Sequence, residues 1–176
     1  AYCLGLKAND EVIVPNISMI ATANAFKILG CKIKFCDIEA SSKYLSLDNL
    51  KKKITSKTKC IVLVNYNGNN PSYDIRDLIT LCKNRKIHLI EDSAHSFLSY
   101  YKKNLHHGSV GIASSFSFSP AKLITSGQGG AVCTSNKNMY LKLKKFKDFG
   151  RLKGGNDIHN FFGLNLKFTD IQSALL

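Results

Sequence analysis

The chain has 176 residues, of which 44% are apolar, and its formal net charge is +13. This length suffices for one domain with a sizeable core, and the mixture of apolar and charged residues excludes a fibrous or disordered chain. No apolar run reaches the roughly 18–20 residues that a membrane-spanning helix needs, so we expect no membrane partner.

Segments of strand and helix character alternate along the sequence. In chain order we expect a strand at 11–14, a helix at 20–29, a strand at 32–38, a helix at 46–54, a strand at 60–64 and a helix at 74–86. Strands at 87–90, 114–118 and 131–134 follow, and then a helix at 136–149. Strands separated by helices predict an α/β fold with a mostly parallel sheet that is covered on both faces.

Both ends of the sequence interrupt helical patterns. Residues 1–6 resemble the end of a helix and lack the regions of a signal peptide, whereas 170–176 begin a further apolar helical pattern. We therefore interpret the chain as a fragment of a longer protein.

The six cysteines predict neither disulfides nor a metal centre. No two of them have C-x-x-C spacing, and most lie among apolar residues of expected strands and helices. This pattern is typical of buried free thiols in a reducing cytoplasm, which is where we expect the protein to be.

The positive charge raises the hypothesis of nucleic-acid binding. Nearly all the basic residues are lysines, however, and the arginines are Arg76, Arg85 and Arg151. Specific nucleic-acid contacts usually depend on the guanidinium fork, and these lysines are spread over the solvent faces of several expected helices. We therefore expect no nucleic-acid partner and rank this hypothesis third.

Polar residues follow three of the expected strands, where parallel sheets gather their functional groups. These positions are 65–66, 91–93 and 117–119. Asp92 on its own fits a simple capping role. Lys122 is flanked by the apolar residues Ala121, Leu123 and Ile124 and precedes a glycine-rich turn, so partial desolvation of its amine, and hence nucleophilic character, is a further hypothesis.

An ordered set of motifs resembles the DegT/DnrJ/EryC1/StrS aminotransferases. The set comprises 91–95 (Glu-Asp-Ser-Ala-His), 115–122 (Ser-Phe-Ser-Phe-Ser-Pro-Ala-Lys) and 127–132 (Gly-Gln-Gly-Gly-Ala-Val). Upstream, 10–15 and 21–24 are similar to the first core strand and helix of the family, and downstream 163–165 and 170–174 are similar to a later asparagine-containing segment. Each motif alone is weak, but together they span the whole chain in the family's order.

The resemblance implies the three-layer α/β/α fold of fold-type-I pyridoxal-phosphate enzymes. Residues 1–176 would form the central part of the large cofactor-binding domain, without the N-terminal segment and the small C-terminal domain. Lys122 would bind pyridoxal 5'-phosphate through a Schiff base and serve as acid and base, while Asp92 would pair with the ring nitrogen. His95 would lie by the ring, and Ser117 would contact the phosphate.

Two further positions follow from the same resemblance. Met19 stands where family members usually have an aromatic ring that stacks on the cofactor, and methionine also packs on π faces. Asn165 would reach the phosphate region of a neighbouring subunit, which implies a homodimer.

The activity implied by the resemblance is transfer of an amino group, from glutamate, to a keto-sugar nucleotide that serves as a precursor of surface polysaccharides or glycoconjugates. Sugar dehydratases of the family carry histidine in place of the lysine, so Lys122 argues against that branch. The alternative is a regulatory or degenerate homologue that binds the cofactor without turnover. Two departures from the family motivate it, namely Met19 and Gln128, which replaces a common acidic residue of the glycine-rich turn.

Overall fold

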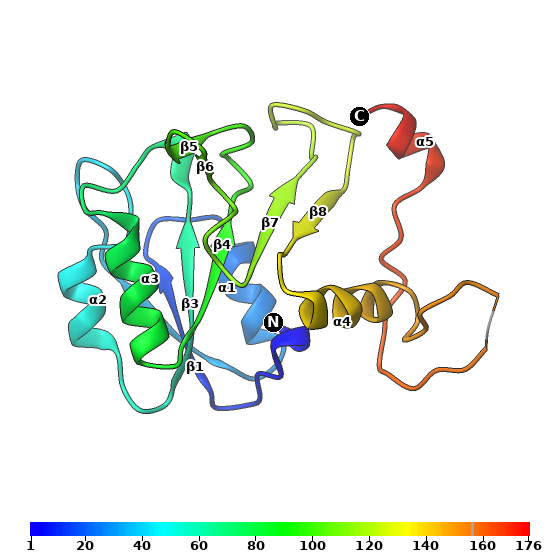
Figure 1. Ribbon diagram of the computed structural model, residues 1–176, viewed down its shortest axis with the longest axis horizontal. Helices are drawn as coiled ribbons and strands as arrows, with labels where there is room; N and C mark the ends of the chain where they lie inside the picture. The colour runs from blue at the N-terminus through cyan, green and yellow to red at the C-terminus, as the bar shows by residue number, and fades with distance from the viewer. Residues whose placement is uncertain (156) are drawn as a thin grey trace.

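The computed structural model describes residues 1–155 and 157–176, and a mixed sheet of six strands forms its centre (Figure 1). The strand order is β2-β1-β3-β4-β7-β8, and β8 alone runs antiparallel to its neighbour. The strands are β1 (Glu11–Pro15), β2 (Lys32–Cys36), β3 (Thr58–Val64), β4 (His88–Asp92), β7 (Ala113–Ser117) and β8 (Gly130–Cys133). A separate hairpin pairs β5 (Tyr100–Lys102) with β6 (Leu105–His106).

Helices cover both faces of the sheet, so the predicted three-layer arrangement is confirmed. They are α1 (Ile20–Lys27), α2 (Leu47–Lys53), α3 (Ile75–Asn84) and α4 (Lys137–Lys147). The short α5 (Asp170–Ala174) has no buried residue and lies apart from the sheet (Figure 1), and the 3-10 turns are η1 (Tyr2–Leu4) and η2 (Tyr66–Gly68). Each strand and helix expected from the sequence is present, with ends that differ by at most two residues. The β5–β6 hairpin and the turn η2 were not predicted, because short polar segments carry no clear periodicity.

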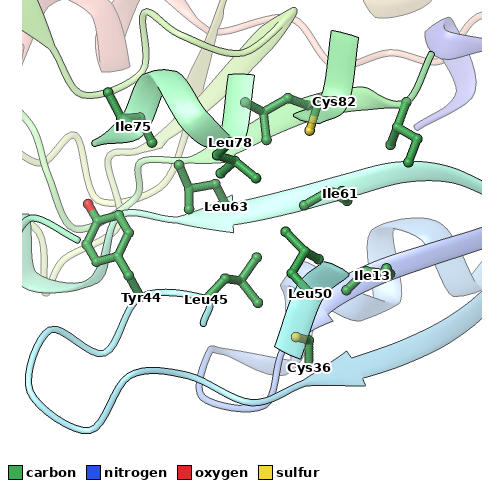
Figure 2. Packing of buried hydrophobic residues seen from close by; sticks show 12 residues of the cluster. Ile13, Cys36, Tyr44, Leu45, Leu50, Ile61, Leu63, Ile75, Leu78 and Cys82 are labelled. Atoms are coloured by element: carbon green, nitrogen blue, oxygen red, sulfur yellow. The ribbon is translucent and has the colours of Figure 1, made fainter. Parts of the chain in front are cut away.

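Strand alternation divides the core into two layers. Ile13 of β1 and Ile61 and Leu63 of β3 pack with Leu50 of α2 and Leu78 of α3, as Figure 2 shows. On the opposite face, the side chains of the intervening strand residues pack against α1, and α4 packs beside β4 and β7. The buried members of this second layer include Val12, Val14, Ala23, Phe26, Cys60, Val62, Ala113 and Met139.

Five of the six cysteines are buried free thiols, as predicted, but Cys133 is exposed. It lies in β8, the edge strand of the sheet, which has a neighbour on one side only. Burial raises the pKa of the Cys36 thiol to about 11 and that of Cys82 to about 12, so both are neutral. Over residues 1–155 and 157–176, no helix combines the length and the apolar character required to cross a bilayer.

The pleat of β4 sends two adjacent carboxylates to opposite faces of the sheet. Leu89 packs in the α2–α3 layer and Ile90 in the α1 layer, so Glu91 follows Leu89 and Asp92 follows Ile90. Glu91 is fully buried, with 0% of its surface exposed. Asp92 opens into a cavity that is described below.

Glu91 holds a loop onto the sheet through charge-assisted hydrogen bonds. Both carboxylate oxygens accept hydrogen bonds at 2.7–3.2 Å, and three of the five donors are backbone amides of the segment between β6 and β7. The donors are Asn65 Nδ2, Tyr101 OH and Gly108 N on Oε1, and Val110 N and Gly111 N on Oε2. A buried carboxylate is tolerated only with such a full set of partners.

Aromatic groups complete the surroundings of Glu91. Burial, and then the nearby Glu91 carboxylate, raises the pKa of the Tyr101 and Tyr44 hydroxyls above the usual range, which keeps both as donors. Tyr44 donates to Asn65 Oδ1 at 2.9 Å. His107 lies against the Tyr101 ring with its Nε2 3.0 Å from Asn70 Oδ1, and its buried Nδ1 has no hydrogen-bond partner in the described chain.

Replacement of Glu91 tests this arrangement. We expect Glu91→Gln to lower the free energy of unfolding of the full-length protein by about 3 kcal/mol or more, because an amide NH₂ would then face backbone N–H donors in a buried site. Chemical unfolding followed by circular dichroism measures the change. The same substitution at an exposed carboxylate, Asp48→Asn, serves as the control and should change stability by no more than about 0.5 kcal/mol. A loss below about 1 kcal/mol for Glu91→Gln would contradict the proposed anchoring.

The neutral state of His107 predicts a pH dependence of stability. Burial lowers the pKa of His107 from its usual value near 6.5, although Glu91 acts in the opposite direction. The unfolded chain therefore binds the additional proton first, and stability falls as the pH drops below about 6.5 toward the lowered folded value. In His107→Gln the slope of unfolding free energy against pH should decrease by up to about 1.4 kcal/mol per unit in this window.

The exposed neighbour provides the control for this measurement. His106→Gln, which removes a histidine in contact with solvent, serves as this control. An unchanged slope in His107→Gln would show that His107 is not held neutral by burial.

Candidate active site

A cavity of about 590 Å³ lies at the carboxyl ends of β3, β4 and β7, on the α1 side of the sheet. Volumes of roughly 300–1,000 Å³ with mostly apolar walls and a few convergent polar groups are typical of small-molecule sites. Several polar residues of the predicted site reach this cavity from different parts of the chain. The apolar wall includes Phe26, Val62, Val64, Ile90 and Phe116.

Asp92 is held by donors on both of its oxygens. The Thr22 hydroxyl donates to Oδ2 at 2.6 Å, and the backbone amide of Ala94 donates to Oδ1 at 3.2 Å. Thr22 Oγ1 also lies 2.7 Å from Ser18 Oγ. The cavity wall therefore presents an oriented carboxylate beside the first turn of α1.

Ser117 is the last residue of β7, and Lys122 belongs to the segment that follows this strand. Both line the cavity, and Ser119 lies between them in sequence and lines it too. The Ser119 amide donates to Ser117 Oγ at 3.3 Å, and the Lys122 amide donates to the Ser119 carbonyl at 3.0 Å. These two hydrogen bonds close a turn, and Lys122 at its end lines the cavity.

The neighbours of Lys122 differ from the sequence expectation. Ala121 is exposed, and Leu123 has 76% of its surface exposed, because the turn directs these side chains outward. Lys122 itself is half-buried. Ala121 and Leu123 therefore do not bury its amine, whereas Ile124 is half-buried and Lys122 lines the cavity.

Met19 and His95 complete the part of the site that was predicted from sequence. Met19 is the N-cap residue of α1, lines the cavity and is 71% exposed. His95 lines the cavity beside Tyr66, whose ring centroid is 6.0 Å away with the rings at 65°. Tyr66 thus adds an aromatic face that sequence analysis placed at a strand end without assigning it a role.

Asn165 does not share this cavity. It is exposed and forms an isolated antiparallel bridge with Asp148, which also pairs with Arg151 and Lys167. Its expected role in a neighbouring subunit stays a prediction.

Two glycines fit the backbone closely at the cavity's edge. A Cβ added to Gly130 would lie 2.6 Å from the Phe116 carbonyl oxygen on the adjacent strand, and one added to Gly129 would lie 2.1 Å from the Phe168 ring. Gly129 also has φ of +140°, which L residues rarely adopt. The glycine-rich segment therefore lets β8 pair closely with β7 next to Ser117 and Lys122.

Thr22 and Ser18 are functional candidates that sequence analysis missed. Residues 21–24 carried part of the family resemblance, but nothing in the sequence shows that Thr22 meets a carboxylate 70 residues away. A buried threonine in the first turn of a helix that leaves the sheet edge was the available signal. Among the described residues, no group of three or more His, Cys, Asp or Glu side chains is arranged to hold a metal ion.

The three-layer fold and the lysine–carboxylate cavity together define an aminotransferase-like α/β protein, and comparison with known proteins makes this specific. All of residues 1–176 match the model of the DegT/DnrJ/EryC1/StrS aminotransferase family. The chain therefore belongs to this family. A GDP-perosamine synthase from Escherichia coli O157:H7 is 37% identical over 172 residues, which cover 98% of this chain and 46% of that protein.

Solved structures agree with this assignment. PseC of Helicobacter pylori, an aminotransferase involved in the biosynthesis of pseudoaminic acid, gives a TM-score of 0.86 at 33% identity, with 96% of this chain and 45% of that one covered. The aminotransferase TlmJ from Streptoalloteichus hindustanus gives a TM-score of 0.90 at 27% identity, with coverages of 99% and 47%. The chain thus spans about half the length of the relatives it matches.

Proposed function

We propose that the protein carrying this chain is a pyridoxal-phosphate-dependent aminotransferase that transfers an amino group from glutamate to a keto-sugar nucleotide. The observation that carries the proposal is the convergence of Asp92, Ser117 and Lys122 on one cavity at the carboxyl edge of the sheet. The names of the relatives support the substrate class, since one is a GDP-perosamine synthase and another acts in pseudoaminic acid biosynthesis. A role in making surface-polysaccharide or glycoconjugate precursors, in the cytoplasm, follows from this class.

The residues that line the cavity fit pyridoxal phosphate group by group. A carboxylate with both oxygens oriented by donors suits a protonated ring nitrogen, and the amine of Lys122 suits an aldehyde. The hydroxyls of Ser117 and Ser119 are donors for a phosphate, and the apolar wall accommodates a flat ring. The donor set is therefore complementary to the charge of each part of the cofactor.

Each residue would have a separate task in the reaction. Pyridoxal phosphate, when bound, acts as an electron sink for the carbon that carries the transferred amino group. Asp92 would keep the ring nitrogen protonated, and Lys122 Nζ would hold the cofactor covalently and then move the proton between the substrate carbon and C4′ of the cofactor. His95 and Met19 would contact the ring, and Ser117 would bind the phosphate.

The arrangement of the complete protein is part of the same proposal. Residues 1–176 would form the central part of the large domain, and a homodimer would place Asn165 at the neighbouring subunit's phosphate site. The exposed position of Asn165, outside its own cavity, supports this arrangement. Glutamate and the nucleotide sugar would enter from the open side of the cavity.

Reduction by borohydride tests the role of Lys122. We expect the full-length protein, purified with pyridoxal phosphate, to show a visible absorption band that borohydride abolishes, with the label on the peptide containing Lys122. In Lys122→Ala the band and transamination of keto-sugar nucleotides should be lost, because no other lysine of the described chain lines the cavity.

Lys103→Ala is the matched control, since Lys103 is an exposed lysine of the β5–β6 hairpin, and it should retain both properties. Label on another residue, or full activity of Lys122→Ala, would contradict the proposal. A band at Lys122 without any half-reaction toward amino donors would favour the regulatory alternative.

The exposed Met19 provides a second prediction. Met19→Tyr should strengthen binding of pyridoxal phosphate by about two- to tenfold, because an aromatic ring stacked on the cofactor contributes roughly 0.5–1.5 kcal/mol beyond its buried area. Titration of the apoprotein followed by absorbance measures the dissociation constant. The control is Ile28→Tyr, which adds a ring to an exposed position outside the cavity and should leave the constant unchanged. Weaker binding by Met19→Tyr would show that this position does not face the ring.

A further inference from the structure

We propose that Thr22, supported by Ser18, is a positioning residue that orients the Asp92 carboxylate toward the cofactor's ring nitrogen. This inference rests on the proposed function, because it concerns the same cavity. The hydrogen bond between Thr22 Oγ1 and Asp92 Oδ2, at 2.6 Å, carries it.

The direction of both protons follows from the chemistry of the partners. An ionised carboxylate only accepts hydrogen bonds, so the single hydroxyl proton of Thr22 points to Asp92. Thr22 Oγ1 then accepts from Ser18 Oγ, 2.7 Å away. The result is an ordered chain, Ser18 to Thr22 to Asp92, in which each bond polarises the next.

Burial of the Thr22 hydroxyl costs free energy, and its hydrogen bond to Asp92 offsets this cost. Thr22 is 7% exposed and packs in the first turn of α1 beside the apolar residues Ala23 and Phe26. Valine has nearly the same shape and would avoid burying a polar group. The β-branched side chain of Thr22 also restricts χ1, so its hydroxyl has a defined direction.

The contacts of Asp92 explain what this hydroxyl adds. The Ala94 amide holds Oδ1 and Thr22 holds Oδ2, so the two donors together fix the plane of the carboxylate. Without Thr22 a single long bond of 3.2 Å would remain, and the group could rotate. Orientation of this kind matters for a partner that must be held in one geometry.

A purely structural role is the competing explanation, in which the bond only attaches α1 to β4. The chain offers a control for it, because Thr58 is also buried and its hydroxyl donates to a carboxylate, that of Glu11, at 3.4 Å. Thr58 does not line the cavity. Loss of its hydroxyl should affect stability without affecting the cofactor.

The experiment compares four variants of the full-length protein: Thr22→Val, Thr22→Ser, Ser18→Ala and Thr58→Val. For each, absorbance titration gives the dissociation constant of pyridoxal phosphate, and thermal unfolding of the apoprotein gives stability. We expect about tenfold weaker cofactor binding in Thr22→Val, recovery to within about threefold in Thr22→Ser, and about threefold weaker binding in Ser18→Ala. Thr58→Val should bind the cofactor as the wild type does.

Each other outcome has a defined meaning. Wild-type affinity in Thr22→Val would overturn this inference and leave the proposed function in place. Equal weakening in Thr22→Val and Thr58→Val would also overturn it, in favour of general loosening of the fold. Ser18→Ala removes no buried volume from the core, so it decides the question if Thr22→Val does not fold. A wild-type protein that binds no pyridoxal phosphate would refute the proposed function, and the inference with it.

Discussion

The buried carboxylate of Glu91 is the constraint on which the active edge of the sheet depends. It accepts hydrogen bonds from three backbone amides of the loop before β7, and from Asn65 at the end of β3. One side chain of β4 thereby holds the end of β3 on one side and the loop that leads into β7 on the other. Because the anion lies away from water, each bond is stronger than its surface equivalent, and loss of any partner is costly.

The pleat of one strand allows two successive acids to serve different purposes. Glu91 lies among internal donors, and both of its carboxylate oxygens accept hydrogen bonds from them. Asp92 lies on the other face with fewer donors and lines the cavity, so it retains acceptor capacity for a ligand. The hydrogen bonds of Glu91 therefore also fix the position of Asp92, the next residue at the end of β4.

Periodicity alone predicted the architecture, because the strands are apolar runs and the helices amphipathic, as in 60–64 and 74–86. The rule that functional groups follow parallel strands placed Asp92 and Ser117 at one edge, where the structure has them. It could not separate Glu91 from Asp92, since that depends on which face each residue takes. Nor could it find Thr22, whose partner is distant in sequence, or the exposure of Leu123, which depends on the turn at Ser119.

The exposed rim of the cavity relates burial to reactivity. Met19 and Val132 are exposed apolar residues that line the cavity together with the half-buried Lys122. Electrostatic interactions strengthen as water is removed. Burial of an apolar rim against another surface is itself favourable and removes water from the cavity. A cofactor, a substrate or a neighbouring protein surface that covers this rim would therefore strengthen the electrostatic interactions of both Asp92 and Lys122. In the proposed function, the sheet would position the polar groups, and covering of the cavity would strengthen their interactions.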